Sequence, residues 1–74
     1  MNMDAKKKIS LLEDMFEMDE GTLKPETELN AIENWDSMSK LSLIVLMDDE
    51  FGKTLKSDEI KTFNTIQDIM NFMD

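Results

Sequence analysis

Apolar residues recur three or four positions apart in the first part of the chain, from Asp4 to about Met18. The repeating positions are Ile9, Leu12, Met15 and Phe16. Because an α-helix turns once in about 3.6 residues, this spacing places them on one face and predicts an amphipathic helix. Asp4 is a suitable N-cap, and the lysines at 6–8 are expected to lie on the solvated side.

The helical pattern lapses between that helix and Trp35. Residues 19–21 are expected to end the helix, and Pro25 fixes one backbone angle and disfavours helix just before it. The segment allows a short helical turn near 31–34. Three isolated apolar residues are expected to hold this loop against the core: Leu23, Leu29 and Ile32. A loop this long is unusual in so small a domain and is often functional.

The clearest helix is expected after Asp36. Asp36 is a good N-cap, Ser37 would open the helix, and Gly52 would end it. Two neighbouring apolar stripes follow from the spacing. The first comprises Leu43, Ile44, Met47 and Phe51, and the second Met38, Leu41 and Val45. This apolar surface is wider than one packed face needs. Either the helix is wedged between two neighbours, or part of its apolar face serves another purpose.

Two further helices are expected in the last third of the chain. Ser57 would cap a brief helix over 58–62. Asn64 or Thr65 would cap the last helix, whose apolar positions are Ile66, Ile69, Met70, Phe72 and Met73. Four helical patterns indicate an all-α fold, and 74 residues leave room for a single domain, 1–74.

Composition narrows the function classes. The formal net charge is −9, from 17 acidic and 8 basic residues. Such a chain is a poor ligand for nucleic acid or anionic membranes and favours basic protein surfaces. No stretch approaches the ~20 apolar residues of a membrane span, and no secretory signal is visible. We therefore expect a cytoplasmic protein that acts as a monomer.

The residue types needed for catalysis are scarce. The chain has no His, Cys or Tyr, so a Ser–His or Cys–His pair cannot form and the preferred zinc ligands are missing. We expect neither an enzyme nor a metal protein.

Ser37 is the residue best placed for a modification. A helix N-terminus exposes unpaired backbone N–H groups and the positive end of the helix dipole, which together stabilise a phosphate. A serine in the first turn is therefore suited to bear a phosphodiester, with Asp36 holding the helix end in shape. Asp-Ser before an apolar run is also an ordinary helix start, so these residues alone leave both interpretations open.

The wider sequence resembles the acyl carrier protein family. The resemblance lies in residues 35–43, which read WDSMSKLSL, and in residues 46–52, which read LMDDEFG. The family's hallmark is Asp-Ser-Leu at the start of its second helix; here Met38 stands in place of the Leu. The resemblance continues at Ile60 and over residues 65–69, and it covers nearly the whole chain in order.

The resemblance implies a four-helix bundle with a long first loop and a short third helix. It implies that a phosphopantetheinyl transferase esterifies Ser37 with 4′-phosphopantetheine from coenzyme A. Asp36 and Met38 would flank the attached arm. The thiol of the arm would carry acyl groups as thioesters to acyltransferases, ketosynthases or other acyl-processing enzymes, and no residue of the chain would be catalytic.

Two further groups of residues gain a role from the resemblance. Partner enzymes would read an exposed face formed by Met38, Leu41, Val45, Asp48, Asp49 and Glu59. An acyl chain would shelter among Leu43, Ile44, Met47 and Phe51, although such residues are more often plain core.

The pathway and one alternative function stay open. The exposed face just after the serine is usually acidic in fatty-acid carriers, whereas here it holds Ser39, Lys40 and Ser42. A specialised polyketide or cell-surface pathway is therefore as compatible as fatty-acid synthesis. The alternative function is an acidic helical interaction module that has no prosthetic group.

Overall fold

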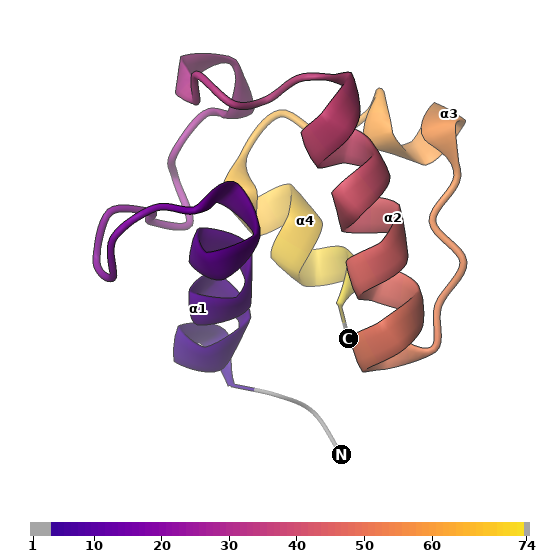
Figure 1. The fold of residues 1–74 in the computed structure, drawn as a ribbon, viewed down its shortest axis with the longest axis horizontal. Helices are drawn as coiled ribbons and strands as arrows, with labels where there is room; N and C mark the ends of the chain where they lie inside the picture. The colour runs from indigo at the N-terminus through magenta and orange to yellow at the C-terminus, as the bar shows by residue number, and fades with distance from the viewer. Residues whose placement is uncertain (1–3, 74) are drawn as a thin grey trace.

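The computed structural model describes residues 4–73, and this part of the chain is helical without strands (Figure 1). The elements in order are α1 (Ala5–Phe16), the 3₁₀ helix η1 (Leu29–Ala31), α2 (Ser37–Phe51), α3 (Ser57–Ile60) and α4 (Ile66–Phe72). In the view of Figure 1, α1 and α2 stand on either side of α4. The expected fold is confirmed: an all-α bundle of four helices with a long first loop and a short third helix.

α1 begins as expected and ends earlier. The side chain of Asp4 accepts a hydrogen bond from the backbone N–H of Lys7 at 2.8 Å. The helix stops at Phe16, two residues short of the predicted end, because Glu17 adopts a left-handed conformation with φ 58°. The N–H of Met18 then bonds back to the carbonyl of Glu13 at 2.8 Å, which closes the helix end.

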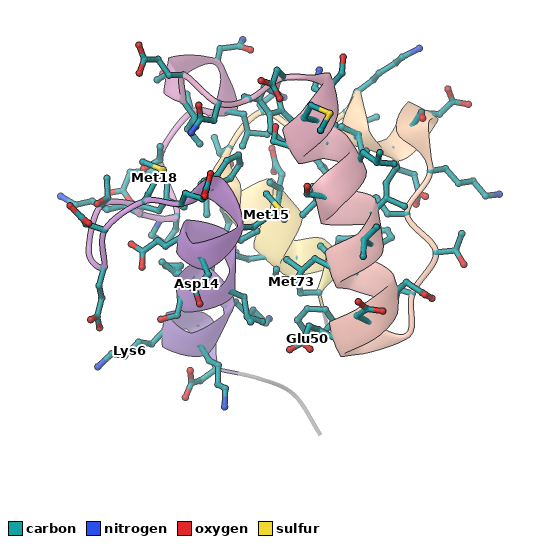
Figure 2. The ribbon with its side chains drawn as sticks, viewed as in Figure 1. Lys6, Asp14, Met15, Met18, Glu50 and Met73 are labelled. Atoms are coloured by element: carbon teal, nitrogen blue, oxygen red, sulfur yellow. The ribbon has the colours of Figure 1, made fainter. Side chains whose placement is uncertain are left out.

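The expectation that all three N-terminal lysines face solvent is wrong for Lys8. Lys6 is exposed and points away from the molecule (Figure 2), whereas Lys8 is buried. Its ammonium donates to the carbonyl of Met70, at 3.4 Å. Lys8 lies four residues before Leu12 and so shares its core-facing side of α1. Its aliphatic stem packs there while the charged end reaches a polar group.

The long loop is held against the bundle as predicted. Leu23, Leu29 and Ile32 are all buried in the core. The buried carboxylate of Glu13 accepts the backbone N–H of Leu23 at 3.0 Å, a contact that the apolar pattern did not predict. The helical turn in this loop is η1, which begins two residues earlier than expected.

The end of the loop also bonds to the start of α4. The N–H of Leu29 donates to the carbonyl of Asn64 at 2.9 Å, and the N–H of Ile66 donates to the carbonyl of Thr27 at 3.0 Å. These bonds join two segments more than thirty residues apart, so the loop is fixed before it reaches α2.

The last two helices differ from the expectation only at their ends. α3 begins at Ser57 with Lys56 in the N-cap position, and it is one short turn rather than five residues. Glu59 accepts the N–H of Lys56 at 3.0 Å, so a glutamate within the helix satisfies the backbone donor of the N-cap residue. Thr65 is the N-cap of α4, one of the two residues expected.

The core is formed where α1, α2 and α4 meet. Its fully buried large side chains are Leu12, Phe16, Leu29, Leu43, Met47, Ile66 and Ile69. The two sides of α2 therefore differ: one enters this core, and the other faces outward with Ser37 at its beginning.

Candidate functional site

The first turn of α2 is fixed by a reciprocal cap. The Asp36 carboxylate accepts the N–H of Ser39 at 3.0 Å, and the Ser39 hydroxyl accepts the N–H of Asp36 at 2.9 Å. The Ser39 hydroxyl is buried against this cap and donates to the Asp36 carbonyl at 3.0 Å. Both side chains are thus occupied with the helix end. Sequence reasoning assigned the cap to Asp36 but missed Ser39, although its spacing is that of a capping box.

Ser37 is left free of that cap and exposed. It is the first residue of α2, directly after the N-cap. Backbone N–H groups at a helix start have no partner within the helix, and the helix dipole is positive there. An oxygen of Ser37 that bears a phosphate would therefore sit in a favourable field.

A groove of about 620 Å³ opens beside Ser37. Its walls come from η1, from the residue before the α2 cap, from the first half of α2, from α3 and from the segment that leads into α4; α3 lies close to the first turn of α2 in Figure 1. The lining residues are Asn30, Trp35, Ser37, Lys40, Leu41, Ile44, Ser57, Ile60, Lys61, Phe63 and Asn64.

The groove is part apolar and part cationic. Its apolar wall includes Trp35, Ile44 and Phe63, and its positive charge comes from Lys40 and Lys61. The ammonium of Lys40 lies 5.3 Å from the centroid of the Trp35 ring, within the range of a cation–π contact. None of the lining residues is acidic, although the chain has 17 acidic residues.

Acyl carrier proteins of several organisms are similar to this chain. That of Micrococcus luteus is 30% identical over 57 residues, which covers 77% of this chain and 70% of the relative. That of Thermosynechococcus vestitus is 27% identical over 64 residues, or 86% and 79% of the two chains. That of Myxococcus xanthus is 29% identical over 56 residues, or 76% and 71%. The chain belongs to the acyl carrier protein family. No family model and no solved structure matches it.

Membership of the acyl carrier protein family agrees with several expectations in general terms. Acyl carrier proteins are carriers rather than enzymes, they generally bear phosphopantetheine, and they work with acyl-processing enzymes. Within residues 4–73, no helix is both long and apolar enough to cross a bilayer, and no three His, Cys, Asp or Glu residues gather as metal ligands.

Of the four residues expected to shelter an acyl chain, one lines the groove. Ile44 is half-buried on the groove wall. Leu43 and Met47 lie beside Ile44 on the core-facing part of α2 and are fully buried. Phe51 is half-buried and packs against the core at the end of α2. An acyl chain in this groove would therefore meet Ile44, and it would reach Leu43 and Met47 only if the core opened. The cavity role of these residues remains a prediction.

The residues expected to meet partner enzymes lie mainly on one outward strip of α2. Met38, Leu41 and Val45 are 73%, 58% and 52% exposed, which is unusual for large apolar side chains. Asp48 and Asp49 are exposed further along the same helix. Leu41 belongs both to this strip and to the groove wall.

Glu59 lies apart from that strip. It is half-buried on α3, and its carboxylate is engaged at the helix start by the N–H of Lys56. Its role in partner binding, like that of the α2 strip, remains a prediction.

Sequence reasoning missed most of the groove. Lys40 was treated only as a departure from an acidic surface, Asn64 only as a possible helix cap, and Phe63 was assigned no role. No local pattern marks these residues, because the groove is built from segments that are far apart in the sequence. Trp35 was quoted only as part of the family resemblance, although a large aromatic residue just before a cap is a usable signal.

Proposed function

We propose that residues 1–74 form one carrier domain that bears 4′-phosphopantetheine on Ser37 and carries acyl groups as thioesters. The observation that supports this most strongly is the position of Ser37, exposed at the first residue of α2 beside a groove of about 620 Å³. The three similar acyl carrier proteins support the same function class.

The residues around Ser37 fit the proposed arm. The hydroxyl is accessible, the helix end is rigidly capped by Asp36, and no acidic side chain lines the adjoining groove. The chain has no cysteine, so a thiol for thioester formation has to come from a prosthetic group. When attached, phosphopantetheine supplies that thiol. Met38, exposed next to Ser37, would contact a docked enzyme rather than the arm's attachment atom.

The exposed strip of α2 is proposed as the docking surface for the transferase and for acyltransferases or ketosynthases. Its centre is apolar, with Met38, Leu41 and Val45, and its far end is acidic, with Asp48 and Asp49. An apolar centre beside charge is the usual composition of a protein interface, and acidic residues steer a basic partner into place. Glu59 would add to this charge from α3. The domain is proposed to act as a cytoplasmic monomer.

We propose that the domain serves one of two classes of pathway: fatty-acid synthesis, or a specialised polyketide or cell-surface pathway. Lys40 on α2 and Lys61 after α3 reduce the acidity of the face near Ser37. The surface of a partner enzyme should therefore be less basic where it faces Ser37 than where it faces the acidic far end of α2.

Loading of the arm tests the proposal. The protein is incubated with coenzyme A and a broad-specificity phosphopantetheinyl transferase, and its intact mass is measured. We expect one added arm on wild type and none on Ser37→Ala. Ser42→Ala and Ser57→Ala are matched controls, because one alters an exposed serine on the same helix and the other a serine of the same groove.

The same experiment separates the alternative function. The exposed apolar strip would also suit a helical interaction module that has no prosthetic group. That module would fold normally and gain no mass with any transferase. Loading that persists in Ser37→Ala would instead show that the attachment site is wrong.

A further inference from the structure

We propose that Lys40 and Lys61 hold the phosphodiester of the arm, so that the arm rests in the groove beside Trp35. The inference rests on the proposed attachment at Ser37 and adds a resting position for the arm. Its basis is the charge of the groove, which differs from that of the rest of the chain.

The groove concentrates positive charge in an acidic protein. The net charge of the chain is −9, yet two of its eight basic residues line this one groove and no acidic residue does. Three acidic residues adjoin the lining residues in sequence. The carboxylates of Asp36 and Glu59 are used at helix starts, where they accept the N–H groups of Ser39 and Lys56, respectively. Asp58 is exposed on α3 and is not part of the groove lining.

Lys40 is close enough to Ser37 to serve an anion attached there. The two residues are three positions apart on α2, a spacing that places side chains on neighbouring sites of a helix surface. Lys40 is half-buried, and its ammonium already lies over the Trp35 ring at the groove wall. Lys61 belongs to the opposite wall, just after α3. An anion bound between the two walls would have the ammonium group of Lys40 on one side and that of Lys61 on the other.

The phosphodiester is the anion that this arrangement fits. In the arm without cargo, it is the only charged group, because the amides and the thiol are neutral at pH 7. It is also the group tied directly to Ser37, whereas the thiol lies at the far end. The apolar part of the groove, with Ile60 and Phe63 beside Trp35, is then left for the neutral part of the arm.

Two signals report whether the arm occupies this groove. Trp35 is the single tryptophan of the chain, so its emission reports on the groove wall alone. The backbone amides of residues 61–64 line or adjoin the opposite wall, so their NMR chemical shifts report on the arm from that side. Both are compared between the unloaded and the loaded protein, with loading verified by intact mass.

Three variants make the comparison specific. Lys40→Met and Lys61→Met keep an unbranched stem and remove the charge, and Lys61→Met leaves the Lys40–Trp35 contact in place. Lys24→Met is the matched control, because Lys24 is an exposed lysine of the long loop outside the groove. We expect loading to shift both signals in wild type and Lys24→Met. In each groove variant the ratio of resting to free arm should fall roughly 1.5- to 5-fold, the range typical of partly exposed ion pairs.

The salt dependence of the two signals is an independent test. Raising the salt concentration to about 1 M shortens the screening length to roughly 3 Å and should reduce the loading-induced shifts in wild type. Shifts of equal size in all variants, insensitive to salt, would mean that apolar contact alone holds the arm and would overturn the proposal. So would a fully loaded wild type with no shift at Trp35 or residues 61–64. Failure of Ser37 to load is seen in the mass measurement and would instead overturn the proposed function itself.

Discussion

Asp36 and Ser37 are adjacent residues with separate roles at the start of α2. The Asp36 carboxylate accepts a hydrogen bond from the N–H of Ser39 and so stabilises the start of the helix. The Ser37 side chain follows the cap and is exposed. The cap therefore fixes the position of Ser37, the proposed attachment site, without engaging its hydroxyl.

Removing the cap should reduce stability without removing the attachment site. Asp36→Ala is expected to lower the free energy of unfolding by about 1 kcal/mol, because the N–H of Ser39 loses its partner. Asp36→Asn should lose much less, since an amide oxygen also caps a helix. Urea denaturation of the three proteins measures this. Equal losses in both variants would show that the negative charge, rather than the hydrogen bond, is what matters.

α4 shows how a short helix is stabilised within this fold. It has seven residues, too few to be stable alone in water. At its start, Asp68 accepts the N–H groups of Asn64 at 2.8 Å and Thr65 at 3.1 Å. At its end, the ammonium of Lys53 donates to the carbonyl of Phe72 at 2.9 Å. A cation at the C-terminus also matches the helix dipole.

The start of α4 should make stability depend on pH. The N–H groups of Asn64 and then Thr65 hold the pKa of Asp68 below its usual value of 3.8. A lowered pKa in the folded state means that the stabilisation is complete above about pH 4 and is lost as pH falls through the folded value. Asp68→Asn should therefore be less stable than wild type at neutral pH, and the gap should narrow below about pH 4. Urea unfolding across that range measures the gap.

A control on α1 isolates this effect. Asp14→Asn alters an exposed carboxylate outside the α4 start. It should not reproduce the narrowing gap. A gap between wild type and Asp68→Asn that stays constant at all pH values would contradict the proposed origin of the stabilisation.

At the scale of the whole molecule, one small core supports both the bundle and the groove. Leu43 and Met47 are fully buried on the core side of α2, the opposite side bears the exposed strip, and the groove lies between the two at Ile44. A 74-residue domain buries a limited share of its surface, so each core side chain contributes a large part of the net stability.

Two substitutions on α2 should separate core from surface. Leu43→Ala is expected to lower the free energy of unfolding by about 2 to 5 kcal/mol, through lost burial and the cavity left behind. Val45→Ala, two residues away but 52% exposed, should change it by roughly 0.5 kcal/mol or less. Thermal or urea unfolding measures both. A small loss in Leu43→Ala would indicate that this part of the core is loosely packed and can open, as an acyl cavity would require.

Local features of the sequence were sufficient for the helices, the caps at Asp4 and Asp36, and the exposed position of Ser37. These depend on spacing along a helix and on hydrogen bonds between residues three or four apart, which a sequence displays directly. The buried positions of Leu23, Leu29 and Ile32 followed from the same logic, because apolar residues in a polar loop need a core to cover them.

The groove and the burial of two charged residues depended on tertiary structure. Lys40 and Lys61 are 21 positions apart and meet on one groove only because α3 packs beside α2. Lys8 and Glu13 are buried because α4 and the long loop present a carbonyl and an N–H to them. No periodicity encodes such encounters, since they depend on where distant backbone groups come to rest once the core has formed.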